Sequence, residues 1–468
     1  AMHNEMLDTR LDRDRPPEAT LPMSKPEQQI ARRSHPLAGT RMSGADMVVQ
    51  VLADEGVDTI FGYSGGAILP TYDAVFRFND SHRREEGSAA MPLIVPANEQ
   101  GAGFMAAGYA RASGKVGVVM VTSGPGATNT VTPVRDCMAD SVPIVVICGQ
   151  VPRAAIGTDA FQEAPVSAIM GAVSKHVFLV TDPDKLEATM RSAFELARTG
   201  RPGPVVIDIP KDVQNWEGEF RGEGSLPMPG YWRRLNAVRD NRLSREAARR
   251  FYDMLEGARK PLIYAGGGVI NGNATKPMRR FANEYGIPVT TTLMALGASD
   301  TTHPLALHML GMHGLASANY AVEDCDLLIA VGARFDDRVA GNPEKFAPKA
   351  RQIVQFDVDI AEIKKVKNVD WHHVGVLATD LSDLLAYGRE FGFQPDWTNW
   401  HTAIAQLKDK YCLNYDRDSE LIQPYAVIEA INAHSRGKAI ISTGVGQHQM
   451  WAAQYFDYRE PRLWLTSG

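Results

Sequence analysis

The sequence is poor in cysteine, has little excess charge of either sign and lacks long hydrophobic runs. Its four cysteines, Cys137, Cys148, Cys325 and Cys412, form no C-x-x-C pair, so neither a disulfide framework nor a zinc site is expected. A net charge of −6 leaves no basic face for a phosphate backbone, which argues against nucleic-acid partners. The longest apolar runs, such as 142–148, are far shorter than the ~20 residues that cross a bilayer. We therefore expect a cytoplasmic protein, not bound to membranes, that acts on small molecules.

The composition is that of a globular protein of several domains, with 44% hydrophobic and 22% charged residues among 468. Residues 1–40 mix acids, bases and prolines without an apolar stretch and are predicted to be a disordered extension. A stretch rich in Gly, Pro and charge at 215–242 is predicted to be a linker. Domains are predicted at 41–214 and 243–395, and a third domain begins at 420–468.

Both long regions alternate amphipathic segments with short Val/Ile-rich runs bounded by Gly and Pro. Apolar runs of this kind indicate strands that are buried on both faces, which are typical of parallel sheets covered by helices. The predicted fold class is therefore α/β, with successive doubly wound domains, of which the third is incomplete. Residues 396–417 are predicted to be a polar connection. The expected strands lie at 116–122, 143–148, 205–210, 261–265, 288–291, 327–331, 353–358 and 439–442.

One carboxylate stands at a predicted switch from strand to helix. The string PANEQGAG at 96–103 contains Glu99, followed by small residues that let a flat ligand approach closely. Alone, Glu99 could simply complement the N-terminus of the helix. Two Gly-rich turns, FGYSGGA at 61–67 and TSGPGATN at 122–129, also follow predicted strands and expose backbone N–H groups. The three strings together indicate a cofactor site.

Further strings extend this pattern along the chain: GQVP at 149–152, AIGTDAFQE at 155–163, GRPGPV at 200–205, PKDV at 210–213, LGMHG at 310–314, VGARFDDRV at 331–339 and VGQHQMW at 445–451. With these motifs, the chain from about residue 44 to 468 resembles the catalytic subunits of the acetohydroxyacid synthase family, also called acetolactate synthases. The resemblance implies thiamine-diphosphate-enzyme architecture: an N-terminal pyrimidine-binding domain, a central FAD-binding Rossmann-like domain and a C-terminal diphosphate-binding domain. It also implies an activity, in which pyruvate is decarboxylated and its hydroxyethyl unit joined to pyruvate or 2-ketobutyrate in branched-chain amino acid biosynthesis.

The resemblance gives Glu99 the central catalytic role. Its carboxylate would hydrogen-bond the aminopyrimidine ring of thiamine diphosphate and promote the proton transfer that forms the reactive ylide. Gly66 and Gln162 are expected beside the reacting atoms, and Phe161, Lys211 and Arg338 at the substrate. The other expected contacts of thiamine diphosphate are Tyr63, Gly65, Pro125, Asn129, Val445, Gly446, Gln447 and His448.

The central region matches residues that hold FAD in the family. Taken singly, a run of glycines can be a tight turn and two arginines can be surface ion pairs, but the VGARFDDRV string favours a flavin site. Arg338 could in addition hold the carboxylate of the second keto acid. The expected FAD residues are Arg201, Gly266, Gly267, Gly268, Thr292, Leu293, Met309, Gly311, Met312, His313, Gly332, Arg334, Asp336, Arg338, Val339, Asp357 and Asp380.

The sequence departs from the family pattern in three places. Ser64 stands where proline is usual, and Asn98 where histidine is usual, which affects rate and substrate preference more than the class of reaction. No Gly-Asp-Gly string occurs, so the ligands of Mg²⁺ are expected beyond Gly468, with no metal ligand in this chain. This chain alone is therefore predicted to be inactive.

Two alternatives to an acetolactate synthase remain open. One is another thiamine-diphosphate 2-keto acid decarboxylase or carboligase, which Glu99 also permits. The other is a catalytically inactive flavin-binding partner, since the metal motif is absent from the sequence. The resemblance further implies a homodimer with active sites between subunits and a possible small regulatory subunit.

Overall fold

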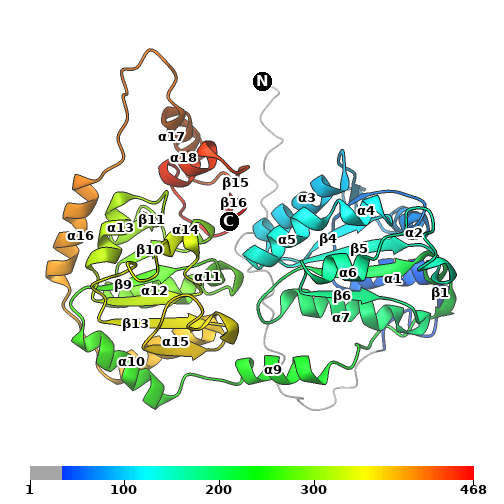
Figure 1. Cartoon of the computed structure of the whole chain (residues 1–468), viewed down its shortest axis with the longest axis horizontal. Coiled ribbons are helices and arrows are strands. Elements are labelled where there is room, and N and C mark those ends of the chain that lie inside the picture. The colour runs from blue at the N-terminus through cyan, green and yellow to red at the C-terminus, as the bar shows by residue number, and fades with distance from the viewer. Residues whose placement is uncertain (1–33) are drawn as a thin grey trace.

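The computed structural model describes residues 34–468, and the predicted extension lies outside the described residues except for a turn over 34–40. Two six-stranded parallel sheets lie side by side, each wrapped by helices, and a smaller C-terminal unit lies beside the second sheet (Figure 1). The α/β fold class predicted from the sequence is confirmed. Within residues 34–468, no helix is long and apolar enough to span a membrane.

The first sheet has the strand order β3-β2-β4-β5-β7-β6. The order reverses between β2 and β4, and ligands of open α/β sheets bind in the crevice at the carboxyl ends of the strands at such a point. Its strands are β2 (Ile60–Tyr63), β3 (Leu93–Ile94), β4 (Gly117–Val121), β5 (Ile144–Gln150), β6 (His176–Leu179) and β7 (Val205–Pro210). Its helices are α1 (Gly44–Asp54), α2 (Leu69–Ser81), α3 (Glu99–Ser113), α4 (Pro125–Thr128), α5 (Val131–Asp140), α6 (Val166–Gly171), α7 (Leu186–Arg198) and α8 (Lys211–Gln214).

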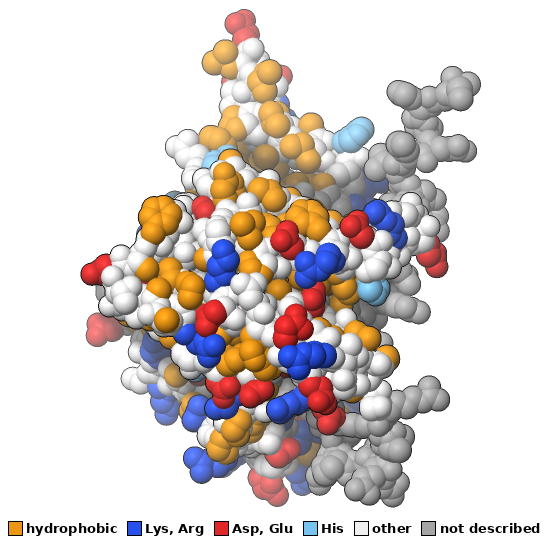
Figure 2. Space-filling view, turned by 90° about the vertical axis from the view of Figure 1, so that its right-hand side faces the viewer, with side chains coloured by type: hydrophobic (Ala, Val, Ile, Leu, Met, Phe, Trp, Pro, Cys, Tyr) orange, Lys and Arg blue, Asp and Glu red, His pale blue; other side chains and the backbone are white. Residues whose placement is uncertain are grey.

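The first sheet is buried on both faces, as its apolar strands predict. Along β4, Val118 and Met120 pack into one hydrophobic cluster, while Val119 and Val121 pack into another. Alternate residues of a strand point to opposite faces, so each cluster lies under one layer of helices. On the outside of this domain, acidic and basic side chains are interspersed, with hydrophobic groups between them (Figure 2).

The stretch predicted as a linker contains regular structure. Strand β8 (Glu217–Glu219) pairs antiparallel with β1 (Arg41–Ser43), and helix α9 (Pro229–Arg239) crosses from one sheet to the other (Figure 1). Pro229 occupies the first turn of α9, where its missing N–H costs nothing, and Leu235 is the residue that the helix buries. The connection between the two domains therefore contains a helix.

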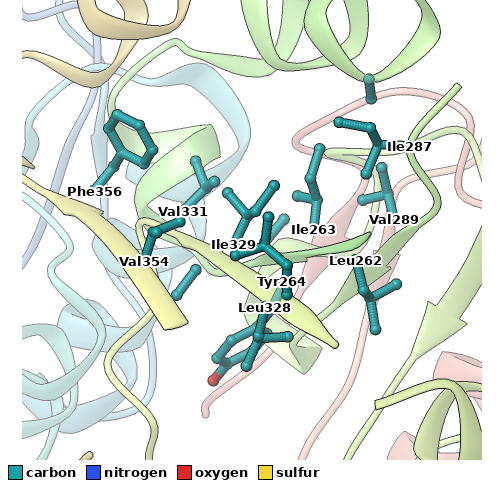
Figure 3. Packing of buried hydrophobic residues seen from close by; sticks show 14 of the residues in the cluster. Leu262, Ile263, Tyr264, Ile287, Val289, Leu328, Ile329, Val331, Val354 and Phe356 are labelled. Atoms are coloured by element: carbon teal, nitrogen blue, oxygen red, sulfur yellow. The ribbon is translucent and has the colours of Figure 1, made fainter. Parts of the chain in front are cut away.

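The second sheet has the order β11-β10-β9-β12-β13-β14, which is the order 3-2-1-4-5-6 of dinucleotide-binding folds. Ile263, Ile329 and Val354 from three neighbouring strands meet in its core (Figure 3). Its strands are β9 (Pro261–Ala265), β10 (Val289–Thr291), β11 (Ala306–Met309), β12 (Leu327–Val331), β13 (Gln352–Asp357) and β14 (Trp371–Val374). Its helices are α10 (Arg245–Gly257), α11 (Gly268–Asn271), α12 (Thr275–Tyr285), α13 (Ala316–Asp324), α14 (Asp337–Ala340) and α15 (Leu377–Glu390).

The prediction of a polar connection at 396–417 is wrong over most of its length, because helix α16 (Thr398–Lys410) lies there. Trp400 and Ile404, one helical turn apart, are each 1% exposed, and the Trp400 indole donates to the carbonyl of Pro261 over 2.9 Å. An apolar stripe on an otherwise polar helix packs it against the central domain. The C-terminal unit follows, with α17 (Pro424–Ser435), β15 (Ile441–Ser442), α18 (Gln447–Tyr455) and β16 (Trp464–Leu465).

Candidate active site and cofactor cavity

Glu99 begins helix α3 at the switch point of the first sheet. Its side chain is buried, at 8% exposure for the residue, and Oε2 accepts a hydrogen bond from Nδ2 of Asn129 over 2.9 Å. Asn98 caps the helix by accepting from the N–H of Gly101 over 2.8 Å. Among residues 34–468, Oε1 of Glu99 accepts no hydrogen bond, and no Lys or Arg forms an ion pair with the carboxylate. The acid is thus held in place with one oxygen free.

The two Gly-rich turns meet beside this carboxylate. The N–H of Ala67, after β2, donates to Oγ1 of Thr122, after β4, over 3.3 Å. A Cβ on Gly65 would lie 2.5 Å from the Cβ of Thr122, so only glycine allows this approach. A Cβ on Gly66 would meet nothing within 4 Å, and one on Gly126 would lie 3.7 Å from Oε1 of Glu99. The structure thus assembles three of the predicted strings around one open space.

Glu99 also affects a buried neighbour. Tyr72, on α2, donates its hydroxyl to the carbonyl of Met120 over 2.9 Å. Burial, and secondly the negative charge of Glu99, raise the pKa of the Tyr72 phenol above its ordinary value. Tyr72 therefore stays a neutral hydrogen-bond donor beneath the site.

The loop that carries Phe161 and Gln162 is shaped by an acid that the sequence analysis did not single out. The Glu163 carboxylate accepts hydrogen bonds from the backbone N–H groups of Gly157 and Ala160. These bonds lower the pKa of Glu163, the bond from Gly157 most of all. Phe161 is left 87% exposed at the tip.

Gln162 lies close to the second Gly-rich turn. Its φ is 57°, and a Cβ on Gly124 would come within 2.5 Å of its carbonyl oxygen. The backbone of Gln162 therefore packs directly against the turn that precedes α4. Lys211 begins α8 at the carboxyl end of β7, on the far side of β5 from the switch point.

The second candidate site is a cavity of about 1210 Å³ at the switch point of the central sheet. Every predicted FAD residue except Gly311 and Asp380 lines this cavity. Gly311 has a φ of +106° and exchanges two hydrogen bonds with Asn319, whereas Asp380 is 1% exposed with Oδ1 3.2 Å from Nε2 of His373. Neither residue lines the cavity.

Glycines form one wall of the cavity, where β9 and β12 end side by side. A Cβ on Gly266 would lie 2.2 Å from the carbonyl oxygen of Gly332. A Cβ on Gly268 would lie 2.8 Å from the Cα of Gly332. Gly332 itself has a φ of +58°. This tight glycine contact lets a ligand approach the backbone at the switch point, which is how dinucleotides bind such sheets.

Charged groups lie at the carboxyl end of β13. Asp357 lines the cavity. Burial, together with the charges of Asp359 and Glu362, raises the pKa of Asp357 to about 6. A backbone hydrogen bond from Asp359 and the charge of Arg201 oppose this shift. Arg201 reaches over from the first domain, where Nε donates to Oγ of Ser141 over 2.8 Å and Nη1 to Oε1 of Glu362 over 2.7 Å. A carboxylate at this place can accept hydrogen bonds from hydroxyl groups of a ligand in the cavity.

The expected substrate residue Arg338 lines the same cavity as the predicted FAD residues. Its side chain is exposed, and Nη1 lies 3.9 Å from Sδ of Met312, which is 61% exposed. Asp336 caps the helix that begins with Asp337 by accepting from the N–H of Arg338 over 3.1 Å. Phe335, in the same string, has a φ of 57° and is buried.

The structure separates the two groups of expected thiamine-diphosphate residues. Val445, Gly446 and Gln447 line the cavity of the central domain, and His448 is exposed beside them. Neither Glu99 nor the other expected thiamine-diphosphate residues of the first domain line that cavity, so the two groups do not share it.

Several lining residues were not found from the sequence. Helix α9 contributes Leu235, Val238 and Arg239, and Asn271 and Gln449 come from other elements. The Leu235–Val238 spacing on a helix that begins with proline was the available signal. Across residues 34–468, no group of three or more His, Cys, Asp or Glu side chains could hold a metal ion.

Comparison with known proteins gives two family matches and a set of close relatives. Residues 42–169 match the thiamine pyrophosphate enzyme N-terminal TPP binding domain, and residues 248–384 match the thiamine pyrophosphate enzyme central domain. The chain is 44% identical over 441 residues to the acetolactate synthase large subunit of Corynebacterium glutamicum, covering 94% of this chain and 68% of that protein. It is 42% identical over 468 residues to the chloroplastic acetolactate synthase of Arabidopsis thaliana, covering 99% and 66%. A chloroplastic acetolactate synthase of Nicotiana tabacum is 44% identical, with 62% of its length covered, so the chain spans about two thirds of these relatives.

Proposed function

The chain belongs to the acetolactate synthase family of thiamine-diphosphate-dependent enzymes, and from that premise we propose that it is the part of such an enzyme that activates the cofactor and binds flavin. The proposed reaction decarboxylates pyruvate and joins the remaining two-carbon unit to a second 2-keto acid, pyruvate or 2-ketobutyrate. The products are acetohydroxy acids for branched-chain amino acid biosynthesis.

The observation that carries this proposal is the environment of Glu99. A buried acid with one oxygen held by Asn129 and the other free is suited to exchange a hydrogen bond with a ring nitrogen. The open space above Gly66, and the small residue at Gly126, leave room for a flat ring next to the free oxygen. Thiamine diphosphate would supply the carbanion chemistry that no side chain offers. Glu99 would hold and move the proton.

The substrate would meet residues from the neighbouring loop. Gln162, placed against Gly124, is proposed to lie beside the reacting atoms, and Phe161 to supply an apolar wall. Lys211 and Arg338 are proposed to attract the carboxylates of the keto acids, since a guanidinium can hold a carboxylate through two hydrogen bonds. Backbone N–H groups of Gly65 and Gly66 would face the developing oxyanion.

FAD is proposed as the ligand of the central cavity. The strand order of the sheet, the glycine wall and Asp357 fit the pyrophosphate and ribose of a dinucleotide. Arg201 and Arg334, both at the cavity, would balance the phosphate charge. Mg²⁺ is proposed to bind together with the diphosphate of thiamine diphosphate.

We propose a homodimer, because the two groups of thiamine-diphosphate residues do not share one cavity in the described chain. In such a dimer, a second copy would place its Val445–His448 turn opposite Glu99. Around Glu99, the apolar side chains of Tyr63, Phe104, Met105 and Phe161 are between 38% and 87% exposed and would be covered in such a dimer. A small regulatory subunit is proposed as a further partner. The four free cysteines suit a cytoplasmic location.

The test uses two proteins: this chain, and a chimera in which the chain continues beyond Gly468 with the corresponding segment of the Corynebacterium glutamicum relative. Both are supplied with thiamine diphosphate, Mg²⁺, FAD and pyruvate, and acetolactate is measured. We expect acetolactate from the chimera and none from the chain alone. Release of acetaldehyde without acetolactate would identify a decarboxylase instead. A folded, flavin-loaded chimera that consumes no pyruvate would favour an inactive flavin-binding protein.

A further inference from the structure

A lysine outside both sites binds the end of the helix that leads into the cavity. Nζ of Lys175 donates to the carbonyl oxygens of Leu196, Thr199 and Arg201, over 2.5, 2.7 and 2.9 Å. All three ammonium protons are therefore used on one short segment. Lys175 itself does not line the cavity.

The segment that Lys175 binds is the C-terminal end of α7 and the turn after it. Carbonyls at a helix C-terminus are the negative end of the helix dipole, and a buried cation there is stabilised. Gly200, in the turn, has a φ of +61°. Thr199, Gly200 and Arg201 all line the cavity, so the turn is part of its wall.

Other groups around Lys175 complete its environment. The ring of Tyr231 lies 5.6 Å from Nζ, and its hydroxyl lies 2.5 Å from Oγ1 of Thr199. The charged neighbours are Asp359 and Glu195, which favour the ammonium, and Arg201, which opposes it. Burial outweighs the two acids and lowers the pKa of Lys175 to about 8.

We propose that Lys175 is a positioning residue of the cofactor cavity: its ammonium fixes the backbone of Thr199–Arg201 and thereby the guanidinium of Arg201. The inference rests on the proposed flavin site. Arg201 is bound at its tip by Ser141 and Glu362, and Lys175 binds it at the backbone, so the side chain is held at both ends. A neutral amine has two N–H donors for three carbonyls, so loss of the proton loosens the turn.

The matched control is Lys408, which makes the same kind of contact elsewhere. Its Nζ donates to the carbonyls of His303, Pro304 and Ala306, over 3.4, 3.0 and 3.0 Å, at the end of β11 away from Met309. Burial lowers its pKa as well. None of these three residues lines the cavity. Lys408→Met therefore removes an equivalent interaction without touching the wall.

The experiment titrates FAD into this chain, followed by quenching of flavin fluorescence. Lys175→Met is expected to lower the affinity for FAD at least tenfold at pH 7, because charge-assisted hydrogen bonds are lost. Lys408→Met is expected to leave the affinity within twofold of wild type. A pH titration of the wild type does not depend on a variant being folded. The affinity of the wild type for FAD should fall between pH 7 and pH 9.5, and Lys175→Met should lack that decrease. Equal affinity in Lys175→Met and wild type, or a wild-type affinity independent of pH over this range, would overturn the proposal.

Hydrogen exchange in the flavin-free chain separates this inference from the flavin assignment. The amides of Thr199 and Gly203 donate to the carbonyls of Glu195 and Ala197 over 3.1 and 3.0 Å and report on the turn. They should exchange faster in Lys175→Met than in wild type, with β5 unchanged. If exchange rises but the wild type binds no FAD, the flavin assignment fails and the role in flavin binding fails with it. If FAD binds and exchange does not change, the role of Lys175 alone is refuted.

Discussion

Asn129 donates its side-chain amide to Oε2 of Glu99 over 2.9 Å, and this is the one hydrogen bond of the Glu99 side chain within residues 34–468. A neutral amide orients the carboxylate without cancelling its charge, as a lysine or arginine would. Asn129 follows β4 and Glu99 follows β3, so the contact joins loops on both sides of β2, at the switch point. The pair defines where a ring nitrogen can approach the free oxygen.

Replacing Glu99 by Gln should lower acetolactate formation by the chimera at least 100-fold, the lower range for loss of a general acid–base group. The amide is nearly isosteric but cannot take up and release the proton. FAD affinity should not change, because Glu99 lies outside the flavin cavity. Turnover near the wild-type rate would remove Glu99 from the mechanism.

The glycine wall gives a second prediction. Gly266→Ala should abolish flavin binding and destabilise the central domain, because its Cβ would lie 2.2 Å from the carbonyl oxygen of Gly332, a backbone atom that cannot move alone. Gly267→Ala should be tolerated better, since its nearest atom is Cβ of Met294 at 3.3 Å. Flavin absorbance of the purified proteins and their thermal unfolding check both.

A control for these substitutions is Gly108→Ala. Gly108 lies within α3, and an added Cβ meets nothing within 4 Å. Alanine should stabilise this helix by ~0.5–1 kcal/mol. Flavin binding by Gly266→Ala at the wild-type level would show that the wall tolerates a side chain and would contradict the prediction.

The buried strands were the part of the fold that the sequence predicted best. The predicted strands at 205–210, 261–265 and 327–331 coincide with β7, β9 and β12, because runs of Val, Ile and Leu bounded by Gly and Pro leave few alternatives. Helices α9 and α16 were missed. Each buries only a narrow stripe, such as Trp400 and Ile404, in a polar segment, so composition alone favoured a linker.

The residues expected to bind the cofactors were predicted as strings, but their grouping in space was not predicted. Gly266 and Gly332 are far apart in sequence and meet only because β9 and β12 are neighbours at the switch point. The contribution of Lys175 was also invisible, since a single lysine before a strand resembles any surface lysine. Such roles depend on which carbonyls a fold places around an ammonium, and sequence spacing does not encode that.

Asp357 predicts a dependence of flavin affinity on pH. Burial raises its pKa to about 6, and the ionised carboxylate can accept two hydrogen bonds from ribose hydroxyls. Affinity should therefore decrease below pH 6, approaching tenfold per pH unit if only the ionised form binds. Asp357→Asn should bind weakly at pH 7 and show no such decrease. An unchanged wild-type affinity from pH 4.5 to 7 would exclude a role for this carboxylate.

Asp208 lies on β7 beneath the loop that carries Gln162 and gives a prediction about stability. It is 1% exposed, and its Oδ2 accepts from Nε2 of Gln150 over 2.9 Å. The same Gln150 nitrogen donates to the carbonyl of Ala164 over 3.2 Å. Within the described chain, Oδ1 has no partner. Burial raises the pKa of Asp208 to about 7, although the Gln150 hydrogen bond opposes this.

The sign of the effect follows from the raised pKa. Between about pH 4 and 7 the folded chain keeps a proton on Asp208 that the unfolded chain has released. The stability that this proton contributes is therefore fully present below about pH 4, decreases as pH rises above that value, and is lost once pH has risen through 7. The loss is ~1.4 kcal/mol per pH unit at most. Asp208→Asn cannot titrate, so the difference in free energy of unfolding between wild type and variant should shift toward the variant across this range.

Chemical unfolding at several pH values, followed by fluorescence, measures that difference. Asp212→Asn is the control on the same domain: although burial opposes it, hydrogen bonds from Arg153 lower the pKa of Asp212, so its contribution is lost as pH falls instead. The contribution of Asp212 changes only below about pH 4, so between pH 4.5 and 7.5 the difference between Asp212→Asn and wild type should stay nearly constant, whereas the difference for Asp208→Asn should shift. If Asp208→Asn differs from wild type by the same amount at pH 4.5 and pH 7.5, Asp208 does not hold its proton in the folded chain. Gln150 and the loop after Phe161 would then be supported by a carboxylate, not by a neutral acid.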